Sequence, residues 1–169
     1  IILGVIQGLT EFLPVSSSGH LEITRELLST NQLPSDNLLM TSVLHFATAL
    51  STILVFRKDI YDLIKGLFDK ENKTSKSYVI KILIAIVPAG LVGFLLSDEI
   101  EFLFSGNMTL VGIMLIITGT LLFLTKILKT KNFKISKVHA LIIGLSQAFA
   151  VIPGISRSGA TICTSLFLG

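Results

Sequence analysis

The chain has 169 residues, of which 51% are hydrophobic and only 15% are charged. Soluble domains carry about 25% charged residues, so this composition excludes an ordinary soluble domain and indicates an integral α-helical membrane protein. The net charge of +3 is modest, and no basic face with interleaved aromatic residues suggests a nucleic-acid partner.

The first element is an apolar segment over residues 1–13, which would be about 20 Å long as a helix. It is too short to cross a hydrocarbon core of about 30 Å. It ends at Pro14, and the polar stretch VSSSGH follows before the chain turns apolar again. Because non-helical backbone at membrane depth must be covered by protein or reached by water, this pattern predicts a re-entrant hairpin over about residues 1–30.

Three longer apolar segments predict transmembrane helices over about residues 38–56, 79–97 and 108–128. Each contains a stretch without Asp, Glu, Lys or Arg that is close to the 17–25 residues a spanning helix needs.

The segments between these helices alternate in charge. Residues 57–81 carry seven basic and four acidic residues, and residues 126–137 carry five lysines and no acid. Residues 21–37 carry three acids and one base, and residues 98–106 carry three acids and no base. Cytoplasmic loops of membrane proteins are enriched in Lys and Arg, so we expect the two basic segments to be cytoplasmic and the two acidic ones external.

A second short apolar segment, residues 138–152, would be about 22 Å long and ends at Pro153. It predicts a second re-entrant hairpin over about residues 138–169, within a single membrane domain that covers residues 1–169. The only cysteine, Cys163, excludes an intrachain disulfide and is expected to be a small apolar residue in a buried helix.

The two hairpin segments resemble each other. Gln7 matches Gln147, Pro14 matches Pro153, and the pattern Ser-x-Ser-Gly recurs at residues 16–19 and 156–159. Three predicted spans separate the copies, so the hairpins should enter from opposite faces of the membrane. The sequence therefore predicts an all-α bundle with an inverted-topology repeat, a design whose sites lie near the midplane at the repeat interface.

Arg157 is the most informative candidate site residue. A guanidinium between apolar segments is costly unless it is paired or hydrated, so a charge there points to function. Its planar fork suits a phosphate, the hydroxyls of Ser156, Ser158 and Thr161 add donors, and glycines such as Gly159 let the backbone approach an anion. The alternative is a structural arginine paired with Glu11.

Glu11 is the other costly charge, and Gln7 stands one helical turn before it. The carboxylate could act as a general base, as a metal ligand together with Gln7, or as the partner of Arg157. His20 suits proton transfer or attack on phosphorus, and the hydroxyl of Ser17, or of its neighbours Ser16 and Ser18, suits a nucleophile or a phosphate ligand. Gly19 completes this first set.

The two remaining histidines receive a structural interpretation. His45, within the first span, and His139, at the start of the second hairpin, are expected to serve helix packing or interfacial hydrogen bonding. Brought together, the two polar tips would supply a phosphate clamp, a nucleophile and a base, which are the parts that hydrolysis of a phosphoryl group needs.

The segments QGLTEFLPVSSSGHL, residues 7–21, and PGISRSGAT, residues 153–161, resemble the two signature motifs of the bacterial undecaprenyl-diphosphatases, the bacitracin-resistance family. The resemblance implies a multi-pass enzyme of the bacterial plasma membrane, with its site facing the periplasmic side. Its reaction would convert undecaprenyl diphosphate to undecaprenyl phosphate, the lipid carrier of cell-wall synthesis, and so confer bacitracin resistance.

The family pattern also implies roles for individual residues. Glu11 matches the essential acid, Ser17 and His20 match the motif serine and histidine, and Arg157 matches the phosphate-binding arginine. Gln7 stands at a variable position of the acidic motif. The resemblance further implies stimulation by a divalent cation, Mg²⁺ or Ca²⁺, and a lipid diphosphate substrate within the bilayer. It leaves open whether the protein is a homodimer.

Two matters stay open. An inverted-repeat transporter or channel for a phosphate-containing or other anion is the main alternative function, and a non-catalytic lipid-binding subunit is a third. The sequence also does not choose between Ser17, His20 and an activated water as the nucleophile.

The chain begins and stops inside apolar runs, so we expect a fragment truncated at both ends.

Overall fold

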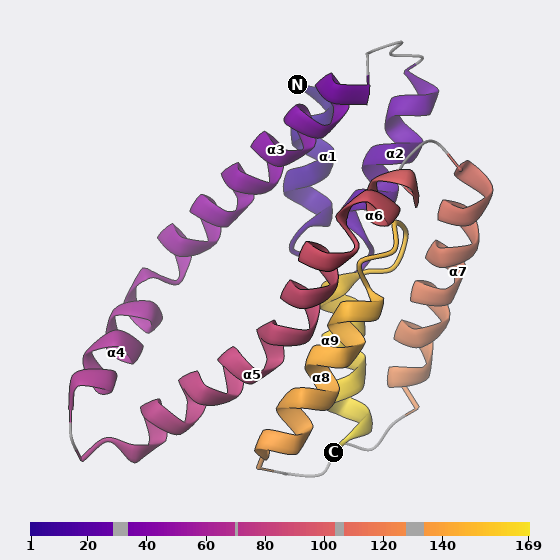
Figure 1. Cartoon of the computed structure of the whole chain (residues 1–169). Helices are drawn as coiled ribbons and strands as arrows, with labels where there is room; N and C mark the ends of the chain where they lie inside the picture. The colour runs from indigo at the N-terminus through magenta and orange to yellow at the C-terminus, as the bar shows by residue number, and fades with distance from the viewer. Residues whose placement is uncertain (29–33, 70, 104–106, 128–133) are drawn as a thin grey trace.

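The computed structural model describes residues 1–28, 34–69, 71–103, 107–127 and 134–169, and within these ranges the regular secondary structure is entirely helical (Figure 1). The helices are α1 (Ile2–Thr10), α2 (Ser17–Leu27), α3 (Pro34–Val55), α4 (Arg57–Phe68), α5 (Lys73–Leu95), α6 (Ser97–Leu103), α7 (Met108–Thr125), α8 (Lys137–Phe149) and α9 (Arg157–Phe167).

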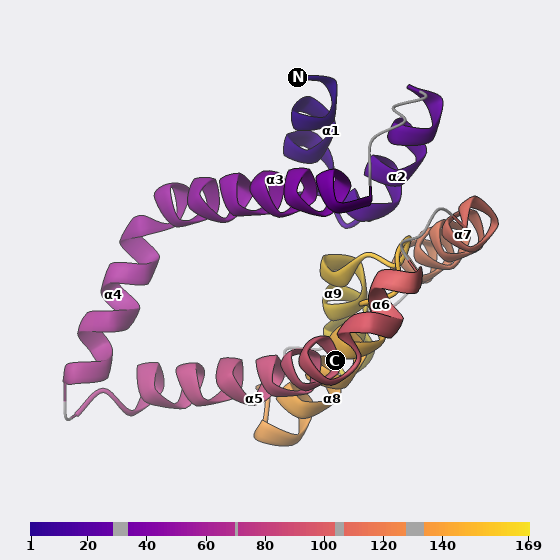
Figure 2. The same ribbon diagram turned by 45° about the horizontal axis from the view of Figure 1, so that its top comes forward.

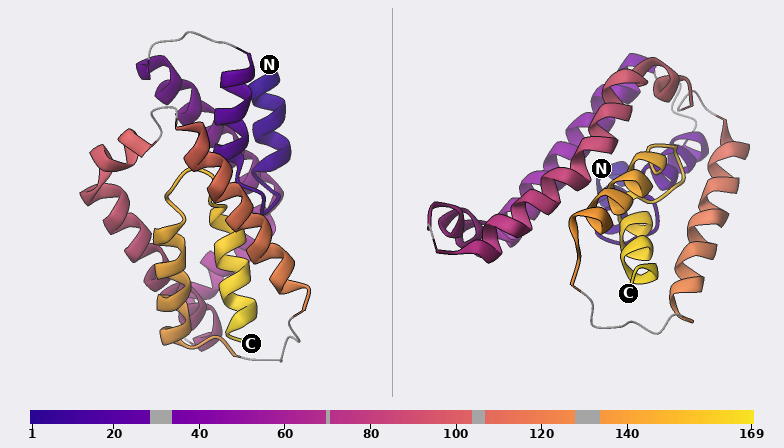
Figure 3. Two further views of the ribbon diagram at one scale, coloured as in Figure 1. Left: turned by 90° about the vertical axis from the view of Figure 1, so that its right-hand side faces the viewer. Right: turned by 60° about the horizontal axis from the view of Figure 1, so that its bottom comes forward.

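Two of the helix pairs form short hairpins at opposite ends of the chain. Helices α1 and α2 pack on each other and are joined around Pro14, and α8 and α9 pack on each other and are joined around Pro153. The open end of the first hairpin lies at the top of Figure 1 and that of the second at the bottom, and the side view in Figure 3 agrees. The two turns therefore face each other in the middle of the molecule.

Helices α5 and α7 are long and apolar enough to cross a membrane, with mean hydropathies of 2.3 and 2.2. Helices α3 and α4 would make a third span only as a bent pair, because their axes differ by 73° at the break around Phe56. Figure 2 shows α4 linking α3 to α5 at a distance from the hairpins. Large apolar side chains such as Phe46, Phe94 and Ile116 are exposed, as expected where lipid is the solvent.

The charged connecting segments contain more helix than the sequence interpretation allowed. Residues 57–81 and 98–106 were interpreted as connecting loops, yet Arg57–Phe68 forms α4, and Ser97–Leu103 forms α6. Helix α4 is explained by its apolar spacing, since Ile60, Ile64 and Leu67 recur at intervals of three or four. In the sequence, the charged residues on the polar face of this amphipathic helix therefore resemble the charged residues of a loop.

The ends of the molecule nevertheless keep the charge alternation. In Figure 1 the end of α2 and the acidic helix α6 lie in the upper half of the molecule, whereas α4 and the start of α8 lie in the lower half. His139 has the capping role expected of a structural residue: its Nδ1 accepts from the Ser136 N–H at 3.2 Å, while Ser136 Oγ accepts from the His139 N–H.

The buried core is small and lies where the hairpins meet α7. Among the described residues, the buried apolar side chains are Leu21 of α2, Val111 of α7, Ala140 of α8, Ala150 and Val151 of the second turn, and Ala160 and Cys163 of α9. Cys163 is 1% exposed, which confirms its interpretation as a small buried residue. Small side chains let the short helices approach closely, as is common in membrane helix bundles.

Helices α5 and α8 make the most extensive contact among the described elements. Gly144 permits this contact, because a Cβ at that position would lie 2.5 Å from the carbonyl oxygen of Ala85. The neighbouring atoms belong to the α5 backbone and have no freedom to rotate away.

We predict that Gly144→Ala lowers the free energy of unfolding by about 1–3 kcal/mol, the usual cost of overpacking. Gly90→Ala in α5 is the matched control, because a Cβ there meets nothing within 4 Å. It should leave stability unchanged or raise it by up to about 1 kcal/mol through helix propensity. Unfolding in detergent measures both, and equal stabilities would contradict the packing argument.

Candidate functional site

The turns of the two hairpins pack directly against each other. A Cβ on Gly19, in the first turn of α2, would lie 3.1 Å from the Cα of Gly154, and one on Gly159 would lie 3.0 Å from the carbonyl oxygen of Pro14. The two tips, residues 14–20 and 153–161, therefore meet as the proposed site requires. Their glycines allow a distance at which larger residues would clash.

The helices that follow the tips begin in the same way. Ser16 caps α2 by accepting a hydrogen bond from the Gly19 N–H at 3.3 Å, and Ser156 caps α9 by accepting from the Gly159 N–H at 3.0 Å. Both glycine amides are thus engaged by the caps. In the structure, Gly19 and Gly159 therefore serve to let the two tips pack closely.

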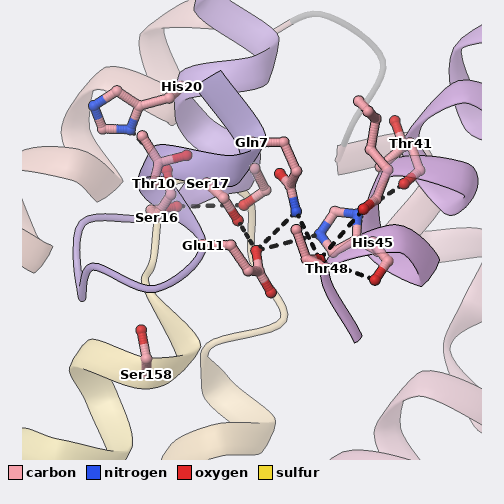
Figure 4. Close-up of polar contacts among 12 residues, drawn as sticks. Gln7, Thr10, Glu11, Ser16, Ser17, His20, Thr41, His45, Thr48 and Ser158 are labelled. Atoms are coloured by element: carbon pink, nitrogen blue, oxygen red, sulfur yellow. Dashed lines mark hydrogen bonds and ion pairs between the residues drawn. The ribbon is translucent and has the colours of Figure 1, made fainter. Parts of the chain in front are cut away.

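The hydroxyl two residues after each cap lies next to it. Ser18 Oγ is 3.3 Å from Ser16 Oγ, and Ser158 Oγ is 3.1 Å from Ser156 Oγ. All four serines line one cavity of about 390 Å³ between the tips, and in Figure 4 the Ser158 hydroxyl points up toward the first tip.

Glu11 is the hub of the polar contacts in the first tip (Figure 4). Its Oε2 accepts hydrogen bonds from Gln7 Nε2 at 3.0 Å and from Ser17 Oγ at 2.5 Å. Gln7 is 1% exposed and also contacts Thr48 Oγ1 at 3.5 Å. The carboxylate is thereby held against the Ser17 hydroxyl, one of the candidate nucleophiles that the sequence leaves open.

Helix α3 supplies a wall of the cavity that the sequence interpretation missed. Thr41, Ser42 and His45 line it, and His45 Nε2 lies 3.9 Å from Glu11 Oε2. His45 Nδ1 is 2.8 Å from the Thr41 carbonyl oxygen, which can only accept, so Nδ1 carries a proton and Nε2 faces the carboxylate. His45 therefore makes a hydrogen bond of the kind expected of a structural residue and also faces the cavity.

A signal for this wall does exist in the sequence. Thr41, His45 and Thr48 recur at intervals of four and three, and so share one face of a helix whose middle part is mostly apolar. A polar stripe of this kind on a spanning helix indicates a face turned toward protein or water rather than lipid.

Arg157 comes to the same cavity from the second tip. It is exposed, and within the described part of the chain no acidic side chain forms an ion pair with it. The alternative of a structural pair with Glu11 is not what the structure shows. A cationic fork is thus available to an anion, across the cavity from a carboxylate.

Two predicted site residues lie apart from this group. His20 Nδ1 is 2.8 Å from the Ser16 carbonyl oxygen, and its ring points away from Glu11 in Figure 4. Thr161 Oγ1 donates to the Ser158 carbonyl oxygen at 3.0 Å, and neither residue lines the cavity. The structure brings together Glu11 with Ser17, and Arg157 with its flanking serines.

The residues near Glu11 fit a weakly held divalent cation. The described residues contain no cluster of three or more His, Cys, Asp or Glu side chains that would bind a metal alone. Mg²⁺, however, is commonly held by one or two carboxylates, water and substrate phosphates. Gln7 Oε1 is buried and has no hydrogen-bond partner among the described residues, while Nε2 of the same amide donates to Glu11, so rotation of the amide would bring an unsatisfied oxygen donor to the carboxylate.

The fold and cavity together define a class: a multi-pass helical membrane protein with a polar cavity between two hairpin tips, basic on one side and acidic on the other. Comparison with known proteins identifies the family. The family model described as bacitracin resistance protein BacA matches residues 1–169, and the chain therefore belongs to this family.

Relatives support the assignment. A protein of Christiangramia forsetii is 53% identical over 169 residues, and one of Bacteroides fragilis (strain ATCC 25285) is 47% identical over 170 residues, each over the whole of this chain. One of Bacteroides thetaiotaomicron is 47% identical over 99% of it. All three are named undecaprenyl-diphosphatase, and the chain spans 63–64% of their lengths.

We predict that Gly19→Ala disturbs the contact between the tips, because the added methyl group meets the Gly154 backbone and the Leu115 side chain, each at 3.1 Å. The free energy of unfolding should fall by about 1 kcal/mol or more. Gly8→Ala in α1 is the control, since its Cβ meets nothing within 4 Å. Equal thermal unfolding midpoints for the two variants would argue against a tight contact.

Proposed function

We propose that the protein hydrolyses undecaprenyl diphosphate to undecaprenyl phosphate and inorganic phosphate. This reaction recycles the lipid carrier of peptidoglycan synthesis and would confer bacitracin resistance. The family and the printed name of its relatives support the proposal. The observation that carries it is that the Ser17–Glu11 pair lines one cavity with the Arg157 guanidinium, which forms no ion pair within the described residues.

Residues of the second tip would bind the diphosphate. Arg157 presents two N–H groups in one plane, which match two phosphate oxygens, and Ser156 and Ser158 add hydroxyl donors beside it. Helices α2 and α9 both begin at the cavity, so the positive ends of their dipoles favour an anion there. The apolar tail would remain among the exposed apolar side chains, in contact with lipid.

The reaction itself would begin at Ser17. Its Oγ attacks the terminal phosphorus, an Oγ–P bond forms, and the bond from that phosphorus to the bridging oxygen breaks. The hydroxyl proton passes to Glu11 Oε2, which already accepts it in a hydrogen bond, and Glu11 passes it on to the freed bridging oxygen as undecaprenyl phosphate leaves. Glu11 then takes a proton from water, which attacks the phosphoserine, and the proton returns to Oγ as inorganic phosphate departs.

A divalent cation, held by Glu11 and Gln7, would neutralise charge on the diphosphate when bound. Gln7 also acts without it, because its amide donates to Glu11 Oε2 and so keeps the carboxylate turned toward Ser17. His20 is assigned no part in the chemical step, because its ring lies outside the cavity.

The hairpins are proposed to be re-entrant and to form an inverted repeat in the plasma membrane, with the site open to the periplasmic side. Their opposite directions, the equivalent serine caps at Ser16 and Ser156, and the acidic and basic ends of the molecule support this arrangement. The alternative of an anion transporter predicts flux without turnover, and no observation favours it.

We predict that Glu11→Gln and Arg157→Lys each reduce phosphate release from a C55 lipid diphosphate by about 100-fold or more in the full-length protein. Glutamine cannot accept the proton, and lysine cannot bind two phosphate oxygens in one plane. Glu26→Gln and Arg57→Lys are matched controls, because both residues are exposed and lie outside the cavity. Near wild-type rates in the two site variants would refute the assignment.

We also predict a phosphoenzyme on Ser17. Rapid acid quenching with labelled substrate should trap an acid-stable label, which disappears in Ser17→Ala and persists in His20→Ala. The chemical reason is that phosphoserine survives acid, whereas phosphohistidine does not. An acid-labile label lost in His20→Ala, or no label in a fully active enzyme, would exclude Ser17 as the nucleophile.

A further inference from the structure

Helix α7 supports the second tip from the side opposite the cavity. Gly154 has a φ of 95°, and a Cβ there would lie 2.7 Å from both the Val111 carbonyl oxygen and the Met114 Cβ. The tip therefore adopts a left-handed backbone conformation in direct contact with α7. At such a short separation, the polar backbone groups of the tip have no room for water on this side.

One side chain of α7 satisfies those groups. Thr118 Oγ1 donates a hydrogen bond to the Gly154 carbonyl oxygen at 2.9 Å and accepts one from the Ser156 N–H at 3.1 Å. Thr118 is 4% exposed, and Ser156 is 3% exposed. A single hydroxyl thus serves as donor and acceptor for two buried backbone groups, which would otherwise be unsatisfied in the hydrocarbon region.

These bonds fix the residues that precede Arg157. The Ser156 amide is held by Thr118, and the Ser156 hydroxyl caps α9 through the Gly159 N–H. Arg157 is the first residue of α9, so the position of its backbone follows from the cap. The direction of the guanidinium into the cavity then depends on a hydroxyl on the far side of the tip.

We infer that Thr118 is a positioning residue, which orients Arg157 toward the substrate phosphate through the Gly154–Ser156 backbone. This role rests on the proposed diphosphatase function. It is distinct from the packing of α7, because packing needs only the volume of the side chain, whereas positioning needs its hydroxyl. A substitution that keeps the side-chain volume and removes the hydroxyl separates these two requirements.

The kinetic test compares three variants of the full-length protein. Thr118→Val keeps the shape and removes the hydroxyl, and kcat/KM should fall about tenfold or more, since two buried backbone groups lose their partner. Thr118→Ser keeps the hydroxyl and should restore activity to within about twofold of wild type. Thr120→Val is the matched control, because Thr120 is exposed and its hydroxyl donates to the Ile116 carbonyl oxygen of its own helix.

A double-mutant cycle with Arg157→Lys shows through which residue Thr118 acts. If Thr118 acts by orienting the guanidinium, Thr118→Val should cost much less in the Arg157→Lys background than in the wild type. Equal costs in the two backgrounds would overturn the inference.

Amide hydrogen exchange gives a readout that does not depend on turnover. Exchange at Ser156 should be about tenfold or more faster in Thr118→Val than in wild type, and unchanged in Thr120→Val. If Thr118→Val does not fold, Thr118→Cys replaces it, because a thiol has a similar size but bonds weakly.

The possible outcomes distinguish failure of the proposed function from failure of the inference about Thr118. A wild-type protein that releases no phosphate refutes the proposed function, while the exchange experiment still decides whether Thr118 holds the tip. An active wild type in which Thr118→Val matches Thr120→Val in both assays overturns the inference about Thr118.

Discussion

The contact between two glycine-containing turns is the constraint on which the rest of the structure depends. Neither tip is a site by itself: the first holds the Glu11 carboxylate and the Ser17 hydroxyl, and the second holds the Arg157 guanidinium. They share a cavity only because Gly19 and Gly159 let backbone approach backbone. Small residues have the same effect in pairs of membrane helices. There they let the backbones pack closely, and this packing stabilises the pair in place of hydrophobic burial.

Keeping Glu11 and Arg157 in one cavity without pairing them is the second physical feature. A direct salt bridge would satisfy both charges and leave little for a ligand. Instead, Glu11 is held by neutral donors, Gln7 and Ser17, on its own hairpin, and no acid pairs with Arg157 in the described residues. The charges stay available because each tip satisfies most of its own polar groups, as the serine caps and Thr118 do.

Much of this could be predicted from the sequence, for definable reasons. Apolar length and charge segregation gave the helical membrane class, and the two repeated motifs gave Glu11, Ser17 and Arg157, because charged residues among apolar ones are rare enough to stand out. The wall formed by His45 was missed, since a lone histidine on an apolar helix is ambiguous until the neighbouring helix is placed. Helix α4 was missed because its charges outweighed its apolar spacing, and the direction of the His20 ring depends on a hydrogen bond to Ser16 that no pattern encodes.

The separation of the two tips along the chain has a consequence for biosynthesis. A ribosome delivers the first tip early, yet its partner emerges only after α3, α5 and α7 have been made. Until then, the polar groups of residues 14–20 lack the backbone that covers them, and the newly inserted hairpin must wait in the translocon or at the lipid interface. Formation of so non-local a contact is expected to be slow and late, so a chain cut short before the second tip would be inserted without the backbone that covers the first tip.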